Sequence, residues 1–351
     1  MNLLKAFAAL KQLRFFSLII SFSLAMPLVA ISAVQGVQAA ESDLVVYSSR
    51  KEHLLKPLTD AYTKLTGVKI TLYTGKEGAL IERLKAEGAE TQADVLMLAD
   101  AGNLGYAAQE GLFQPLNSTL IEKNIPANLR DGAGLWTALS IRARTLIYNT
   151  NKLIPSDLKG YADLADPKWK NELCLRTSKK VYNKSLVASL IAHHGEEKAE
   201  QIVKGWVNNL AMKPQAKDSQ VMQAIIGGGC DVGIVNSYYF GGLVKQQPDV
   251  PLKLFWPDQD TTGTHINVSG AGVIKHADQV QKAKQFIEWL SDGQAQEIYA
   301  EWNNEYPANP TIKPSELVAS WGEFKADSLS LNEVVKYQQQ AVKLMQRVGY
   351  R

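Results

Sequence analysis

The chain has 351 residues, of which 46% are hydrophobic and 21% charged, a composition typical of folded globular proteins rather than disordered or fibrous ones. Its formal charge of +3 equals the contribution of Lys5, Lys11 and Arg14 near the amino terminus, where there is no acidic residue. Because the rest of the chain has no net charge, composition argues against a nucleic-acid partner.

Residues 1–39 have the pattern of an export signal. The basic start is followed by an apolar run over 15–34, and Val37-Gln38-Ala39 supplies the small-residue pattern that signal peptidase cleaves. An uncleaved anchor is the alternative, since the run approaches the ~20 residues that span a bilayer. Three serines and a proline interrupt the run, which favours cleavage near Ala39. No later stretch is apolar enough to cross a membrane, so we expect any transport role to be that of a soluble partner.

After the signal, short apolar strands alternate with amphipathic helices, which predicts α/β architecture with parallel sheets. The first block predicts a βαβαβ unit, with strands at 44–47, 68–73 and 95–98 and helices at 54–65 and 79–87. The second block predicts strands at 173–177 and 231–235 and helices at 185–193, 198–210, 220–226 and from 240 to 246. Two more helices are predicted at 280–290 and 293–301.

Two long extended segments, 138–148 and 266–274, separate these blocks. The exported chain is longer than one compact core usually holds. We therefore predict two lobes joined by hinge strands. The predicted amino-terminal lobe is 40–137 with 268–310, and the carboxy-terminal lobe is 138–267 with 311–351.

The chain has two cysteines, Cys174 and Cys230, and in an exported protein we expect them to form a disulfide. Two buried free thiols are the alternative. Cys174 precedes Tyr182 by eight residues, and Cys230 precedes Tyr238 by the same interval. If strands 173–177 and 231–235 are parallel neighbours, the tyrosines emerge together at their carboxyl ends, where open α/β sheets bind ligands.

The adjacent Tyr238 and Tyr239 would point to opposite faces of a strand. They follow Asn236 and Ser237, which are good N-cap residues, so we place them in the first turn of a helix. Three phenolates suit a hard trivalent cation such as Fe3+ and would cancel its charge. The alternative for these tyrosines is packing at the end of a strand.

Five segments resemble the ferric-ion-binding proteins of bacterial ABC importers. They are Tyr47-Ser48-Ser49-Arg50, Ser140-Ile141-Arg142-Ala143-Arg144, Val181-Tyr182-Asn183, Asn236-Ser237-Tyr238-Tyr239-Phe240 and Gly263-Thr264-His265-Ile266-Asn267-Val268-Ser269-Gly270. The resemblance implies a type II periplasmic binding fold, a periplasmic location, Fe3+ as the captured ligand and a membrane permease as partner. It also implies that Tyr182, Tyr238 and Tyr239 ligate the iron.

The chain departs from part of that family on the opposite lobe. Some members have a His-Tyr dipeptide after the Tyr-Ser-x-Arg segment, where this sequence has Lys51 and Glu52. His53, one residue further on, is a candidate replacement ligand, and its alternative is a cap or surface residue.

Other members of the family complete the coordination with a small anion such as carbonate, held by an arginine. Arg142 matches that role, because a planar guanidinium binds a planar carbonate through two hydrogen bonds. Arg144 is two residues away on an extended segment and is the second candidate. Ion pairing is the alternative for both.

Two other functions compete with the ferric-receptor prediction. The same fold serves receptors for polyamines, thiamine and small anions, which the fold alone does not separate. An enzyme is the other class, but the chain has no G-x-S-x-G elbow, H-E-x-x-H or Walker-type loop. We therefore predict a monomeric binding protein and not an enzyme.

Overall fold

The structure is a computed structural model that describes residues 43–351. The predicted signal, 1–39, lies outside the described residues. Within the described range, no helix is both long enough and apolar enough to pass through a bilayer.

The chain first forms parallel strands with intervening helices. The strands are β1 (Leu44–Ser48), β2 (Ile70–Thr74) and β3 (Val95–Leu98), with β1 between the other two. The helices are α1 (Glu52–Thr66), α2 (Glu77–Glu87) and α3 (Ala101–Gln109). Leu55, Leu58 and Tyr62 of α1 are buried, and Gly67 ends that helix at a φ of 77°, donating its N–H to the carbonyl of Thr63. The predicted βαβαβ unit is therefore confirmed.

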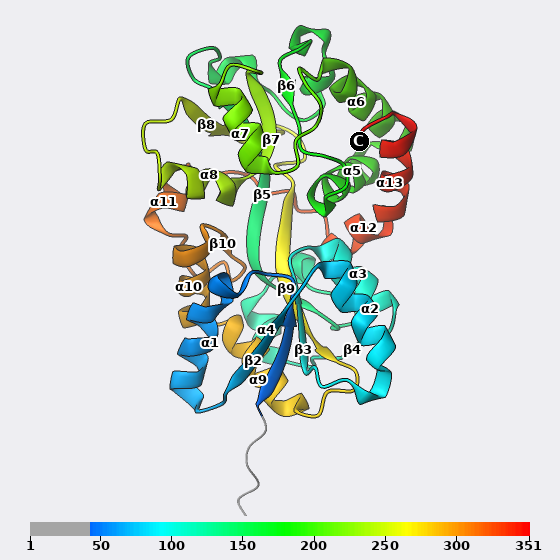
Figure 1. Ribbon diagram of the computed structural model, residues 1–351, viewed down its shortest axis with the longest axis vertical. Helices are drawn as coiled ribbons and strands as arrows, with labels where there is room; N and C mark the ends of the chain where they lie inside the picture. The colour runs from blue at the N-terminus through cyan, green and yellow to red at the C-terminus, as the bar shows by residue number, and fades with distance from the viewer. Residues whose placement is uncertain (1–42) are drawn as a thin grey trace, which may run out of the picture. The chain divides into compact units, whose positions relative to one another are not determined.

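Two long strands connect this unit to the rest of the fold. β5 (Thr137–Asn149) and β9 (Ile266–Ile274) pair antiparallel, as Figure 1 shows near the centre of the molecule. β9 also pairs with β3, whereas the second half of β5 pairs with β7 (Val232–Asn236). The strand order is β2-β1-β3-β9-β5-β7-β6, so both predicted extended segments are confirmed as strands. Short strands complete the sheet: β4 (Phe113–Gln114), β8 (Leu252–Phe255) and β10 (Tyr306–Pro307).

The second α/β part is built around β7 and the short parallel strand β6 (Leu173–Cys174). Its helices are α5 (Val181–His194), α6 (Glu196–Asn209), α7 (Asp218–Ile226) and α8 (Ser237–Val244). The predicted strand 173–177 is shorter than expected, because after Cys174 the chain keeps only an isolated bridge from Arg176 to Gln215. The predicted helix 185–193 begins four residues earlier, which moves Tyr182 into its first turn.

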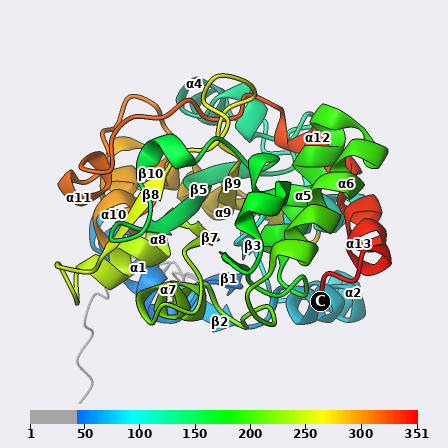
Figure 2. The ribbon, with the colours of Figure 1, turned by 90° about the horizontal axis from the view of Figure 1, so that it is seen from above.

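The remaining helices pack on both parts of the fold. α9 (Val280–Leu290) packs on β9, and α10 (Gly293–Asn303) packs on α1. α12 (Leu331–Lys336) and α13 (Gln338–Arg347) pack on α5, and Figure 2 shows α5, α6 and α13 grouped together. The short helices α4 (Thr119–Asn124) and α11 (Glu316–Ala319) lie on connecting segments.

Separate apolar cores stabilise the two parts. One core gathers side chains around β1, β3 and β9, and two others lie against β5 and β7. Each part thus buries its own apolar surface, as expected of a lobe. The fold is mixed α/β with two lobes, as predicted, while the residue boundaries assigned to the lobes stay a prediction.

Candidate metal centre

A cavity of about 600 Å³ lies beside β5, and most of the predicted site residues line it. Tyr182, Tyr238 and Tyr239 line it, together with His53 and Arg142. The lining therefore comes from α1 of the first lobe, from β5, and from α5 and α8 of the second lobe. Such a position between lobes is typical of ligand sites in proteins with more than one compact unit.

The three tyrosines occupy the first turns of two helices. Tyr182 is the second residue of α5, and Tyr238 and Tyr239 are the second and third residues of α8. The predicted helical position of the Tyr238–Tyr239 pair is therefore confirmed. Residues in the first turn of a helix lie at the positive end of its dipole, which favours nearby negative charge by about 0.3–1 kcal/mol.

The phenol groups form one cluster. Tyr238 Oη donates a hydrogen bond to Tyr182 Oη at 3.3 Å. The rings of Tyr238 and Tyr239 lie 4.3 Å apart between centroids, with an angle of 33° between their planes. Two helices thus bring three phenol rings to one wall of the cavity.

Cys174 and Cys230 form a disulfide, as predicted, with their Cα atoms 6.0 Å apart. It joins β6 to the segment just before β7, and the two strands are parallel neighbours. However, Cys174 pairs in register with Gly233 rather than with Cys230. The equal eight-residue intervals do not reflect equal strand positions, and the tyrosines meet because both helices begin at the same end of the sheet.

Burial controls the protonation of two of these phenols. It raises the pKa of Tyr182, and the nearby Arg142 guanidinium opposes that increase. Burial also raises the pKa of Tyr238 well above its ordinary value, with a further contribution from Tyr182. Both side chains are therefore neutral near pH 7, and a cation that uses them as ligands must displace their protons.

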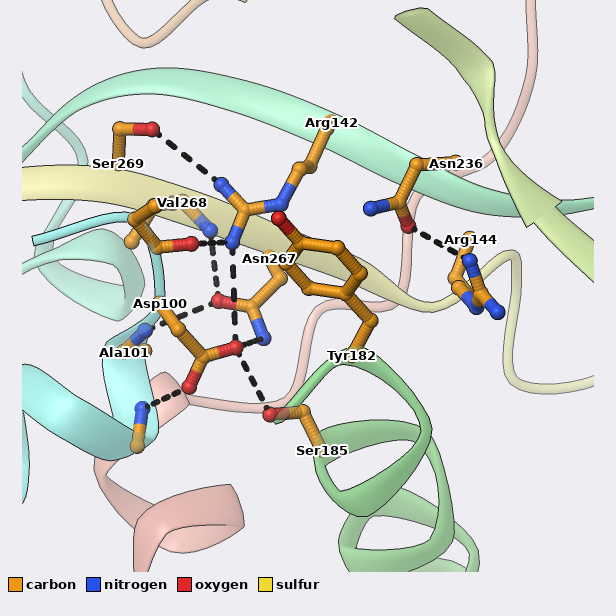
Figure 3. A network of polar contacts seen from close by, with 12 residues as sticks. Asp100, Ala101, Arg142, Arg144, Tyr182, Ser185, Asn236, Asn267, Val268 and Ser269 are labelled. Atoms are coloured by element: carbon orange, nitrogen blue, oxygen red, sulfur yellow. Dashed lines mark hydrogen bonds and ion pairs between the residues drawn. The ribbon is translucent and has the colours of Figure 1, made fainter. Parts of the chain in front are cut away.

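Arg142 is held at the cavity by a polar network shown in Figure 3. Its Nη1 donates to Ser269 Oγ at 3.3 Å and its Nη2 to the carbonyl of Ala99, with Asp100 Oδ2 at 3.8 Å from Nη2. The guanidinium carbon lies 5.3 Å from the centroid of the Tyr182 ring, and its buried Nε has no hydrogen-bond partner. A fixed positive charge therefore stands beside the phenol cluster.

Arg144 does not line the cavity, although it was the second predicted anion ligand. Its Nη1 lies 2.7 Å from Asp218 Oδ2 and 3.3 Å from Asn236 Oδ1, and its Nη2 donates to Asn183 Oδ1 at 2.7 Å. Figure 3 shows it apart from Arg142, although both belong to β5. The reason is that β5 passes from one sheet region to the other between them: Arg142 pairs with Asn267 of β9, whereas Arg144 pairs with Asn236 of β7.

His53 lines the cavity from the first turn of α1, and its side chain is exposed. Lys51 also lines the cavity. It stands where some ferric-ion-binding proteins have the histidine of a His-Tyr dipeptide. Among residues 43–351, no group of three or more His, Cys, Asp or Glu side chains is placed to hold a metal. The oxygen atoms that line this cavity come from the three phenols and also from the carboxylates of Glu77 and Glu305 and several amide and hydroxyl side chains.

Two further arginines were not assigned a role from sequence. Arg50 lines the cavity, and its Nη1 lies 3.0 Å from Glu305 and also donates to Ser269. Arg50 belongs to one of the five segments that resemble the ferric-ion-binding proteins, so the sequence did mark its position. Arg176 lies behind the tyrosine rings, 5.1 Å from the Tyr182 centroid. The sequence indicated Arg176 only as a charged residue within a predicted apolar strand.

Comparison with known proteins agrees with this architecture. The pattern of the bacterial extracellular solute-binding proteins matches residues 58–326. The chain belongs to this family. It is 39% identical over 317 residues to iron uptake protein A1 of Synechocystis sp., covering 89% of this chain and 88% of that protein.

Solved structures of family members share the fold closely. A Trichodesmium protein in complex with iron and citrate ligands is 42% identical, with a TM-score of 0.85 over 88% of this chain and all of that one. The ferric binding protein from Campylobacter jejuni is 34% identical, with a TM-score of 0.83 over 88% of this chain and all of that one. The Campylobacter jejuni relative is a ferric binding protein by name, and the family of this chain is that of extracellular solute-binding proteins.

Proposed function

We propose that this solute-binding protein captures Fe3+ in the cavity between its lobes and delivers it to an ABC-type importer. The observation that carries the proposal is the cluster of Tyr182, Tyr238 and Tyr239 on one wall of a 600 Å³ cavity. The iron and ferric proteins to which the chain is similar support the choice of metal.

Three phenolates match the chemistry of a ferric ion. Anionic oxygen donors suit a small trivalent cation, and three of them cancel its charge. A neutral complex avoids the large cost of leaving an uncompensated charge in a partly buried site. Tyr182, Tyr238 and Tyr239 are the proposed ligands, and His53 is the candidate from the opposite lobe.

A small planar anion such as carbonate would occupy the positions that the protein leaves open. Arg142 would hold it, because its charge lies beside Tyr182 and its Nε has no protein partner. A carboxylate or carbonate is bound well by the fork of a guanidinium. Arg144 is instead a support for Asn183 and Asn236, next to the tyrosines of α5 and α8.

The family supports the biological setting that we propose. The proposed receptor is exported, loses its signal near Ala39, and acts as a monomer in the periplasm. Its partners are the ferric ion and a membrane permease, and it performs no catalysis.

One titration tests the proposal. Ferric ion, supplied as a weak chelate to the metal-stripped protein, should give a visible phenolate-to-iron absorption band. Tyr182→Phe, Tyr238→Phe and Tyr239→Phe each delete one oxygen and keep the ring, so each should weaken the band and lower affinity by about 100-fold or more.

A matched control is Tyr62→Phe, because Tyr62 is buried in the core of the first lobe and does not line the cavity. This variant should keep the colour and affinity of the wild-type protein. If all three cavity variants also kept them, the tyrosines would be packing residues and the ferric proposal would be wrong.

A further inference from the structure

Two buried arginines share one carboxylate behind the tyrosine cluster. Asp218, which is fully buried, lies 2.7 Å from Arg144 Nη1 and 3.5 Å from Arg176 Nη1. Among residues 43–351, no other carboxylate lies within ion-pair distance of either guanidinium. Two positive charges against one negative charge leave a net charge of about one unit in a region that water does not reach.

Arg176 presents this charge to the tyrosine rings. Its side chain is 4% exposed, and its Cζ lies 5.1 Å from the ring centroid of Tyr182 and 5.9 Å from that of Tyr239. Its Nε and Nη1 have no hydrogen-bond partner. Arg176 does not line the cavity, and its guanidinium faces the rings of Tyr182 and Tyr239.

We propose that Arg176 is a positioning residue of the ferric site, which holds the rings of Tyr182 and Tyr239 and sets the electron density of these ligands through its buried charge. The inference rests on the proposed function of the same cavity. A cation over an aromatic face orients the ring, and a partner behind a metal ligand tunes the metal that the ligand holds.

The charge has a predictable effect on bound iron. Fe2+ carries one positive charge fewer than Fe3+, so reduction makes the site one unit more negative whatever anion completes the coordination. A nearby positive charge stabilises the reduced form relative to the oxidised form, so Arg176 raises the reduction potential of the bound iron. Because Arg176 faces the rings and does not line the cavity, it stabilises the phenolate electrons more than the acceptor orbital of the iron, and therefore moves the phenolate-to-iron band to higher energy.

Substitutions at the two ends of the ion pair should act in opposite directions. Arg176→Gln removes the excess positive charge, so the potential should fall and the band should move to longer wavelength. Asp218→Asn leaves both arginines uncompensated, so the potential should rise and the band should move to shorter wavelength. Simple loss of packing would not give opposite signs.

The experiment uses the full mature protein loaded with ferric ion, with spectroelectrochemistry for the potential and visible absorption for the band. Arg176→Lys keeps the charge and should lie closer to the wild-type protein than Arg176→Gln does. Lys204→Gln removes an exposed charge from α6 and should change neither quantity, because solvent screens it. Arg176→Gln should also lower ferric affinity by about 10- to 100-fold.

Thermal unfolding of each variant checks that the fold is retained. If Arg176→Gln does not fold, the other two variants still test the inference. Asp218→Asn should raise the potential and move the band to shorter wavelength, and Arg176→Lys should stay near the wild-type protein. Shifts of the same sign in the Arg176→Gln and Asp218→Asn variants, or no shift in either, would overturn the inference. A wild-type protein that gives no ferric band at all would instead overturn the proposed function, and the inference with it.

Discussion

Iron binding by three phenols should depend steeply on pH. Each ligand must lose a proton when it binds iron, and burial raises the pKa of Tyr182 and Tyr238 in the empty site. Because the free site carries more protons than the iron-bound site, apparent affinity rises with pH below the pKa of the phenols. Three protons correspond to about 1000-fold in affinity per pH unit, or about 4 kcal/mol.

The slope can be measured by competition with a chelator whose own ferric affinity is known at each pH. The visible band reports the bound fraction over about two pH units below neutrality, in carbonate-free buffer. Tyr182→Phe should reduce the slope by one proton, whereas the control Tyr62→Phe should leave it at three. A wild-type slope of one or less would refute the assignment of three phenolate ligands.

Three other predictions concern residues around the cluster. Replacing both Cys174 and Cys230 with Ala should lower the free energy of unfolding by about 4 kcal/mol, given their sequence separation of 56; an unchanged urea midpoint would contradict this. Arg142→Ala should weaken ferric affinity and remove its dependence on bicarbonate. If the variant kept both, another residue would have to hold the anion. Because the side chain of His53 is exposed, His53→Ala should lower affinity less than Tyr182→Phe does, whereas a loss as large as that of Tyr182→Phe would make His53 a full ligand.

Local patterns predicted the elements that carry the tyrosines. Strand β9 at 266–274 and helix α9 at 280–290 match the sequence prediction at both ends, because their apolar spacing is uninterrupted. The first turn of α8 was predicted from capping residues, although the Asn236 side chain makes no capping hydrogen bond. The start of α5 was missed because Lys180 at its N-cap is not a capping residue type.

The features that the sequence did not reveal depend on contacts between residues far apart in the chain. The register of β6 against β7 depends on pairing between segments far apart in the chain, and equal spacing from Cys to Tyr was not a guide to it. The direction of Arg144 depends on Asp218, which lies 74 residues away in sequence. Arg176 was missed for the same reason, since its relation to Tyr182 exists only in the folded chain.

The contacts of one buried carboxylate connect the tyrosine cluster to the other lobe. Asp100, just before α3, accepts hydrogen bonds from Ser185 Oγ at 3.0 Å and from Asn267 Nδ2 at 2.8 Å. Ser185 lies one turn after Tyr182 on α5, and Asn267 lies on the crossing strand β9. Arg142, which faces the Tyr182 ring, is 3.8 Å from the same carboxylate. A ligand shifts a conformational equilibrium only by binding one arrangement better than another. We expect iron to bind better when these contacts hold Tyr182 and Arg142 at the cavity. We therefore expect Asp100→Asn to lower the ferric affinity of the cavity, although the Asp100 carboxylate is not a proposed ligand.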